Sequence, residues 1–283
     1  MAADRVLSTI RLCAEQELTL ALRSRWIQLF AIVFGGLALA IATSGYVLSG
    51  GSGMQDFGRT AASLLQLVLL IVPLATLVMG VLAMTPERGG AELLFAQPVR
   101  REAVLGGMLL GLFEALTAAQ AIGFGAAGVI IFLQVGNEGV AGFLLVGASS
   151  VVLTAVFLAL SAVISVGQIG RKRIRALSWA LVTWCVLALA FDIGVLGLAT
   201  LLRSGHASRL LVVSALINPI DAVRTGTLFG LEGTAAFGPA SLALLRLTGG
   251  PQGAAVLIGL SLTLWIAVPA AFAMRRLARL DIA

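Results

Sequence analysis

Residues 62–84 read ASLLQLVLLIVPLATLVMGVLAM, a run with no charged side chain. A helix needs about 20 mostly apolar residues to cross the hydrocarbon core of a bilayer, so this run is predicted to be a membrane-spanning helix. Five other stretches of the chain have the same apolar character. The six predicted spans cover approximately Ile27–Leu48, Ala62–Met84, Ala103–Leu133, Gly139–Gln168, Ala176–Leu202 and Gly253–Ala273.

The composition of the whole chain agrees with this prediction. Of the 283 residues, 59% are hydrophobic and 11% are charged, whereas about 25% of the residues of a soluble domain are charged. Such a chain cannot cover a water-exposed surface. We therefore predict an all-α polytopic membrane protein, with residues 1–283 as a single transmembrane domain. The composition excludes a disordered, a collagen-like or a disulfide-rich protein.

Few residues of the chain are suited to catalysis or metal binding. Cys13 and Cys185 lie in different contexts, which argues against a disulfide, a redox pair or a zinc site. The single histidine, His206, excludes a multi-histidine metal centre, and the single lysine, Lys172, is not part of a P-loop motif. We therefore predict that this chain has no catalytic residue, metal site or cofactor of its own. Its basic residues lie beside apolar runs and do not indicate nucleic-acid binding.

The basic residues predict which side of the membrane each loop faces, because Lys and Arg concentrate in the cytoplasmic loops of membrane proteins. Fourteen of the 19 basic residues lie in the N-terminal segment, in the loops after the second and fourth predicted spans, and in the C-terminal tail. Both termini are therefore predicted to be cytoplasmic.

Residues 5–25 have the periodicity of an amphipathic helix. Leu7, Ile10, Ala14, Leu18 and Leu22 recur at spacings of three and four. We predict a helix that lies at the membrane interface before the first span. The simpler alternative is a polar lead-in that happens to be helical.

Residues 203–252 form an outer loop that is too long for a plain connection. Its apolar stretch is too short to span a membrane. Asn218 and Pro219 favour a helix start, and Asp221 and Arg224 can pair on one face of that helix. The functional interpretation is a re-entrant segment that closes the outer mouth of a translocation path. The alternative is a folded surface cap.

Two acidic residues fall inside the predicted spans, Glu114 in the third and Asp192 in the fifth. An ionisable group at membrane depth is costly and usually faces a cavity or a partner. Thr117 and Gln120 are expected to continue the helix face of Glu114. Both acids are candidates for a polar translocation path. The alternative is that they form hydrogen bonds that hold helices together.

The loop between the second and third spans, residues 85–101, is predicted to contain a short helix between two prolines. Pro86 can occupy a first helical turn, and Pro98 ends the helix because the residue before a proline disfavours the helical conformation. The Leu-Leu-Phe run at 93–95 gives this helix an apolar face. That face is suited either to a cytoplasmic partner or to the membrane interface.

This loop resembles the coupling segment of ABC-2 type permeases, although Ala91 and Gly107 stand where threonine and lysine are usual. Such permeases have an N-terminal interfacial helix, six spans and a re-entrant segment before the sixth. The resemblance implies a dimer with two separate P-loop ATPase subunits, which hold the ATP and Mg²⁺. The residues that it implies for coupling to the ATPase are Glu87, Arg88, Gly90, Glu92, Leu93, Leu94, Phe95, Pro98 and Arg101.

Shorter motifs narrow the resemblance to the permease family of the nitrous oxide reductase maturation transporter. They are Asn218-Pro219-x-Asp221-x-x-Arg224, Phe191-Asp192 and the run Ile-Gly-Phe-Gly at 122–125. The glycine-rich part near Thr225–Gly250 departs from that family's pattern, which puts the surface for a periplasmic partner in doubt. The resemblance implies a bacterial inner-membrane permease that works with a cytoplasmic ATPase and a periplasmic NosD-like protein. It also implies that the permease moves a cargo towards the periplasm and supports assembly of the reductase's copper centres.

Other functions compete with this one. They are an ABC-2 exporter of a drug, lipid or polysaccharide, an ion-coupled carrier, and a membrane scaffold. The chain has no internal inverted repeat of the kind found in many secondary carriers, which argues against the carrier. The residues expected at a translocation path or outer gate are Glu114, Asp192, Asn218, Pro219, Asp221 and Arg224.

Overall fold

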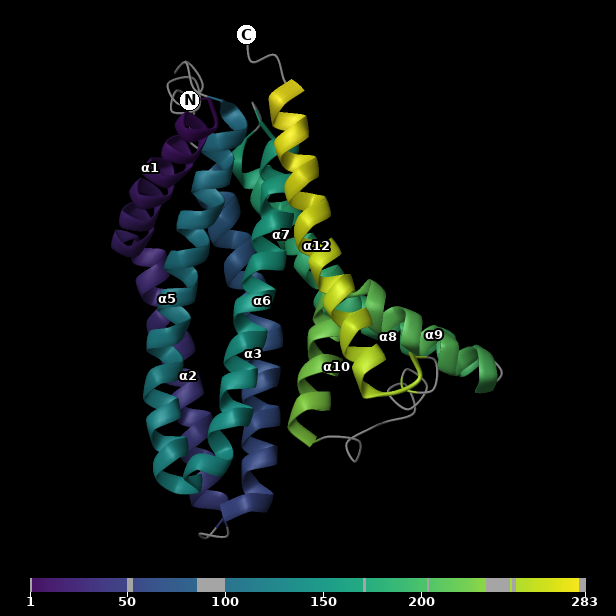
Figure 1. Cartoon of the computed structure of the whole chain (residues 1–283). Helices are drawn as coiled ribbons and strands as arrows, with labels where there is room; N and C mark the ends of the chain where they lie inside the picture. Colours follow the sequence, from purple (N-terminus) through teal and green to yellow (C-terminus); the bar gives the residue numbers. More distant parts are fainter. Residues whose placement is uncertain are drawn as a thin grey trace.

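The computed structural model shows a chain folded into packed helices (Figure 1). Within the described residues every regular element is helical, and six helical segments are long and apolar enough to cross a membrane. The prediction of an all-α protein with six spans is therefore confirmed. The structure describes residues 2–49, 53–85, 100–169, 172–202, 204–232, 245 and 248–279.

The chain order places four long spans before a more divided second half. The first half consists of α1 (Ala2–Arg23), α2 (Arg25–Ser49), α3 (Gly53–Met84), α5 (Arg101–Val135) and α6 (Asn137–Gly167). The second half consists of α7 (Arg173–Cys185), the π-helix η1 (Val186–Ala190), α8 (Phe191–Leu201), α9 (Ser204–Ile217), α10 (Pro219–Glu232) and α12 (Pro251–Arg279). The spans are α2, α3, α5, α6, the continuous segment from α7 to α8, and α12.

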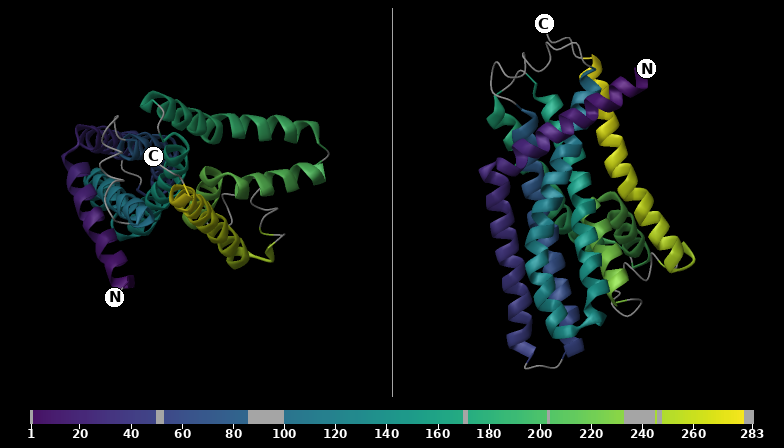
Figure 2. Two further views of the ribbon diagram at one scale, coloured as in Figure 1. Left: turned by 90° about the horizontal axis from the view of Figure 1, so that it is seen from above. Right: turned by 60° about the vertical axis from the view of Figure 1, so that its left-hand side comes forward.

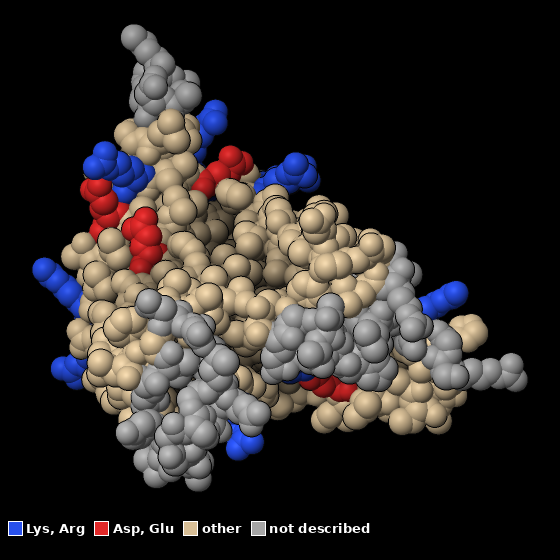
Figure 3. Space-filling model, turned by 60° about the horizontal axis from the view of Figure 1, so that its bottom comes forward, with Lys and Arg blue, Asp and Glu red and all other residues tan. Residues whose placement is uncertain are grey.

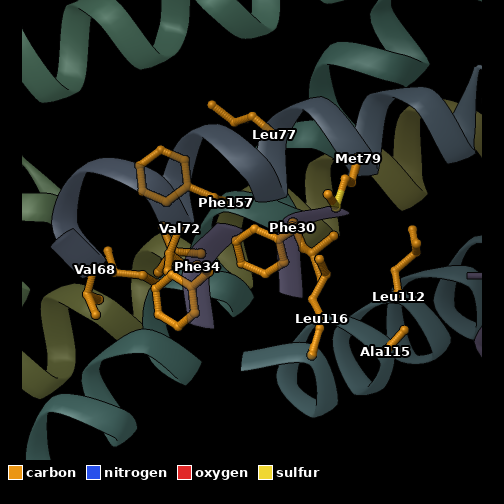
Figure 4. Packing of buried hydrophobic residues seen from close by; sticks show 14 of the residues in the cluster. Phe30, Phe34, Val68, Val72, Leu77, Met79, Leu112, Ala115, Leu116 and Phe157 are labelled. Carbon is orange, nitrogen blue, oxygen red and sulfur yellow. The ribbon is translucent and has the colours of Figure 1, made fainter. Parts of the chain in front are cut away.

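The core lies between α2, α3, α5 and α6, which run side by side (Figures 1 and 2). Their facing sides are apolar and interlock through aromatic rings. Phe30 stacks on Phe34 with ring centroids 5.4 Å apart, and Phe34 meets Phe124 edge to face at 5.0 Å. Figure 4 shows Phe30 and Phe34 among the valine and leucine side chains of neighbouring helices. These four helices form the rigid body to which the other elements attach.

Helix α1 crosses one end of this body obliquely (Figure 2). It packs against α5, where two glycines leave room for its backbone. A Cβ at Gly107 would lie 2.6 Å from the carbonyl oxygen of Ile10, and one at Gly111 would lie 2.9 Å from Cβ of Glu17. Such distances exclude a larger residue without movement of α1. The small-residue spacing therefore seats the amphipathic helix on the protein.

The apolar stripe predicted for residues 5–25 is only partly buried by this contact. Ala14, in the middle of the stripe, is buried against α5, whereas Leu7 and Leu22 near its ends are exposed. The helix turns into α2 at Ser24, whose carbonyl accepts the amide of Gln28 at 3.1 Å. The amphipathic helix thus uses one face against the protein and leaves leucines exposed beside it.

The fifth span is interrupted by η1. Before the interruption, α7 lies on α3, and the indole Nε1 of Trp184 donates to the carbonyl of Leu70 at 3.0 Å. After it, α8 turns away from the bundle and forms a projecting arm with α9 (Figure 2). No residue of α8 is buried. π-helical turns often mark functional sites.

The loop predicted to re-enter the membrane contains a helical hairpin, α9 and α10. Each helix has 14 residues and so measures about 21 Å, which is less than the roughly 30 Å of a bilayer's hydrocarbon core. Helix α10 packs against α6 and α12. Residues 233–244 and 246–247 of this loop lie outside the described residues. From the hairpin, α12 runs back to the end of the bundle at which both termini lie (Figure 1).

The surface agrees with a membrane environment. On the face shown in Figure 3, charged side chains are few and most of the described surface is uncharged. Large apolar side chains such as Ile193, Leu201 and Val256 are more than two-thirds exposed. A soluble monomer rarely exposes contiguous apolar patches of this extent, so these residues face lipid or another subunit.

Candidate functional site

Asn218 forms the junction between α9 and α10. Its backbone N–H donates to the carbonyl of Ser214 at 3.0 Å and closes α9. Its side-chain Oδ1 accepts the backbone N–H of Ile220 at 3.0 Å and caps α10. Pro219 fits the first helical position because its missing N–H would have no partner there. The predicted helix start at this Asn-Pro pair is confirmed.

The other end of the Asn218 side chain joins the hairpin to the fifth span. Its Nδ2 donates to the carbonyl of Leu187, in η1, at 2.8 Å and to Oδ2 of Asp221 at 3.1 Å. Asn218 has no exposed surface. Both N–H donors and the side-chain oxygen of this residue therefore have partners within the protein.

Arg224 completes the cluster. Its Nη1 donates to Oδ1 of Asp221 at 2.8 Å and to Oδ2 of Asp192, on α8, at 2.9 Å. The first contact confirms the pairing that the spacing predicts on α10. The second links α10 to α8 through two residues that lie 32 positions apart in the chain. We call Asp192, Asn218, Asp221, Arg224 and the Leu187 carbonyl the apex network.

The apex network carries one more acid than base. With both carboxylates ionised, Asp192 and Asp221 share a single guanidinium. The side chains of Asp192 and Arg224 are 36% and 31% exposed, whereas that of Asp221 is 14% exposed. Such a cluster can hold two helices together, and its excess carboxylate can bind a proton or a cation. Among the described residues, no set of three His, Cys, Asp or Glu side chains is placed to hold a metal ion.

Polar contacts within the bundle support α10 from the other side. Ser149 on α6 hydrogen-bonds Thr227 on α10. A second pair of contacts joins α6 to α5. The side-chain Nε2 of Gln120, on α5, donates to the hydroxyl of Thr154 at 2.7 Å, and its Oε1 accepts from the hydroxyl of Ser150. Interhelical hydrogen bonds of this kind stabilise helix packing inside a bilayer. They place Gln120 in the core, 2% exposed.

Glu114 lies apart from Gln120, so the expectation that the two share a helix face is wrong. Glu114 is exposed on α5 and forms no hydrogen bond or ion pair with the described residues. Each step of three residues turns a helix by about 300°, so two steps put Gln120 about 120° away from Glu114. A role of Glu114 in a translocation path stays a prediction.

The predicted coupling residues fall mostly on a part of the chain that the structure does not describe. Residues 86–99 lie outside the described ranges. They include Glu87, Arg88, Gly90, Glu92, Leu93, Leu94, Phe95 and Pro98. Arg101 is described and is the first residue of α5. The segment predicted to couple to the ATPase therefore precedes the helix against which α1 packs.

Sequence reasoning missed two parts of the apex network. The pairing of Asp192 with Arg224 had only a partial signal. A lone acid at depth needs a cationic partner, but the predicted outer loop contains four arginines that can supply one. The use of the Leu187 carbonyl had none. The run Val186–Ala190 contains neither Gly nor Pro, so nothing in it marks a π-helical turn.

Comparison with known proteins identifies the family of the chain. The model of a family described as "ABC-2 family transporter protein" matches residues 12–282. The chain is 34% identical over 263 residues to the "Probable ABC transporter permease protein NosY" of Stutzerimonas stutzeri, with 90% of this chain and 92% of that protein covered. It is 33% identical over 238 residues to the protein of the same description from Pseudomonas aeruginosa, with 81% and 85% covered. The resemblance noted in the sequence is confirmed, and the chain belongs to the ABC-2 family of transporter proteins.

Proposed function

We propose that this chain is the transmembrane subunit of an ABC transporter and is driven by ATP hydrolysis on a separate P-loop ATPase. Family membership and the permease descriptions of both relatives support this role. The chain itself has no P-loop motif. A second copy of the chain and two ATPase subunits would complete the transporter.

The transporter would lie in the bacterial inner membrane with both termini in the cytoplasm. Both termini lie at one end of the bundle (Figure 1), and the basic residues concentrate in the segments that belong to that end. The ATPase would dock on residues 85–101 at this end. Movement of this segment reaches α5 at Arg101 and, through Gly107 and Gly111, the seated helix α1.

The apex network is the structural observation that carries the proposal. It joins the outer part of the fifth span to a hairpin that is too short to cross the membrane. A hairpin held in this way can close the outer mouth of a translocation path while the four-helix core stays intact. Asp192, Asn218, Asp221 and Arg224 would be the residues of this outer gate.

The cargo proposal follows the resemblance to NosY. The transporter would support assembly of the copper centres of nitrous oxide reductase by moving a cargo towards the periplasm, together with a periplasmic NosD-like protein. An ABC-2 exporter of a drug, lipid or polysaccharide is the alternative. The apex network, with its excess carboxylate, is the observation that would favour an ion-coupled carrier.

A purified complex of this chain with its ATPase tests the transport mechanism. We expect the complex to hydrolyse ATP, and we expect vanadate to inhibit both this hydrolysis and transport. Glu87→Ala or Arg101→Ala should uncouple ATP hydrolysis from transport. Full transport activity of the chain without any ATPase subunit would overturn the proposal and favour the carrier.

A gene deletion in a nitrous oxide-respiring host tests the cargo proposal separately. We expect the reductase from the deletion strain to lack the absorption bands of its copper centres, and the wild-type gene to restore them. A fully loaded reductase in the deletion strain would refute the maturation role and leave the ABC transport mechanism standing.

A further inference from the structure

A cavity of about 190 Å³ lies where α1, α2, α3, α5 and α7 meet, at the end of the bundle that holds both termini. It is separate from the apex network, none of whose residues line it. Figure 4 shows two of its lining residues, Met79 and Leu112, at one end of the aromatic core. The side chains that matter here are Glu17 and Leu20 of α1, Trp26 of α2, and Arg173 of α7.

Glu17 is an unusual residue to find in such a place. It is partly buried, and it forms no hydrogen bond or ion pair with any described residue. Burial raises the pKa of its carboxyl group. Two residues earlier, Glu15 is exposed and pairs with Arg11 at 2.8 Å. A carboxylate withdrawn from water without a partner is unfavourable, so Glu17 is suited to an external cation.

Arg173 puts the opposite charge on another wall of the same cavity. Its Nη2 donates to the carbonyl of Leu82 at 2.8 Å, which fixes the guanidinium at the edge of α3. A guanidinium matches the oxygens of a phosphate. A cavity with a carboxylate on one side and a guanidinium on another selects a ligand that carries both a cation and an anion.

The size of the cavity and the residues at its rim further restrict the class of ligand that fits. Drug-sized ligands occupy about 300–1,000 Å³, and a single water needs far less than this cavity offers. Leu20 and Trp26 at the rim are 57% and 60% exposed, and tryptophan is typical of the membrane–water interface. The cavity therefore opens where lipid head groups lie.

We propose that this cavity binds the head group of phosphatidylethanolamine, with the primary ammonium on Glu17 and the phosphate on Arg173. A primary ammonium donates N–H groups to the carboxylate. The trimethylammonium of phosphatidylcholine has no N–H to donate, and phosphatidylglycerol offers no cation. The site is independent of the proposed transport function.

The test compares lipids with identical acyl chains on the purified full-length protein. Native mass spectrometry measures which lipids stay bound, and thermal unfolding in detergent measures stabilisation as each lipid is added. We expect retention of phosphatidylethanolamine over both other lipids. Glu17→Gln should weaken that preference about tenfold, as expected for the loss of a charge-assisted hydrogen bond.

Glu15→Gln is the matched control, since it removes an acid from the same helix outside the cavity, and it should leave the preference unchanged. Equal retention of the three lipids by the wild-type protein would overturn the proposal even if the variants failed to fold. A preference that persists in Glu17→Gln would also overturn it. Stabilisation by free phosphoethanolamine equal to that by the lipid would assign the cavity to a soluble ligand instead.

Discussion

The Nδ2 of Asn218 donates a 2.8 Å hydrogen bond to the backbone carbonyl of Leu187, 31 positions earlier in the chain. The bond connects the turn between α9 and α10 to the π-helical interruption of the fifth span. Because the same side chain also caps α10 through its oxygen, one buried residue fixes both the shape of the hairpin and its attachment.

Replacement of Asn218 separates these two roles. Asn218→Ala should lower the free energy of unfolding by about 2 kcal/mol, because it removes the cap and leaves the partly buried Leu187 carbonyl without this donor. Asn218→Ser keeps a capping oxygen but cannot reach Leu187, and should cost less. Thermal unfolding of the purified protein measures both. Because both variants lose the contact with Leu187, equal stability of the two would show that the cap contributes nothing. Stability of Asn218→Ser equal to that of the wild-type protein would show that the contact with Leu187 contributes nothing.

Loss of Asp192 and loss of Arg224 should differ in their effect on stability, because two acids share this one arginine. Asp192→Asn leaves a neutral Asp221–Arg224 pair and should cost about 1 kcal/mol or less, since the Asp192 side chain is more than one-third exposed. Arg224→Gln leaves two neighbouring carboxylates without their cation and should cost more. A double-mutant cycle with unfolding as the readout should show non-additive effects. Additive effects would mean that Asp192 and Arg224 do not interact in the membrane.

Neighbouring glycines on α5 provide a matched test of how α1 is seated. A Cβ at Gly106 meets nothing within 4 Å, whereas one at Gly107 would collide with Ile10 and Cys13 of α1. Gly107→Ala should therefore displace α1 and expose Cys13, while Gly106→Ala should be neutral or stabilising.

The rate at which a maleimide labels Cys13, in a Cys185→Ala background, measures this exposure. Burial raises the pKa of the Cys13 thiol and so slows labelling in the wild-type protein. Similar labelling rates for the two glycine variants would contradict the observed packing.

Two polar residues of α5 should differ sharply in what they contribute to stability. Gln120→Leu removes buried hydrogen bonds to α6 and should cost about 1 kcal/mol. Glu114→Gln changes an exposed side chain and should alter stability by less than about 0.5 kcal/mol. If Glu114→Gln abolished transport at unchanged stability, its predicted place in a translocation path would gain direct support.

The burial of Glu17 predicts how stability depends on pH. Its pKa is raised in the folded protein, so the folded state binds the proton more tightly than the unfolded state does. Stability should therefore fall as the pH rises from the usual glutamate range through the raised pKa. In lipid-free detergent, Glu17→Gln should remove this part of the pH dependence, and Glu15→Gln should not. Melting curves recorded at several pH values check the difference.

The sequence predicts the spans well because the bilayer imposes a length and an apolar character on each of them. It also predicts the Asn218–Pro219 helix start and the Asp221–Arg224 pair, because both depend on spacing within a few residues. Long-range partners are harder to predict. The contact of Asp192 with Arg224 depends on how α8 turns at η1, which no residue of that segment marks.

The glycine spacing on α5 shows the same limit. Gly107 and Gly111 are recognisable as a site of close helix approach, but spacing alone does not identify the approaching helix. The structure shows it to be α1. The face shared by Glu114 and Gln120 was predicted wrongly because steps of three residues drift around a helix, so a polar residue two steps away can face the core.

Two anchors hold the start of the interruption at η1. Trp184 holds the preceding turn to Leu70 of α3, and Asn218 holds Leu187 to the hairpin. Both anchors lead to the core, because α10 itself packs against α3 and α6. A swing of the arm formed by α8 and α9 would therefore place its backbone rotation beyond these contacts. The arm would then move while the stacked rings of Phe30 and Phe34 in the four-helix core keep their packing.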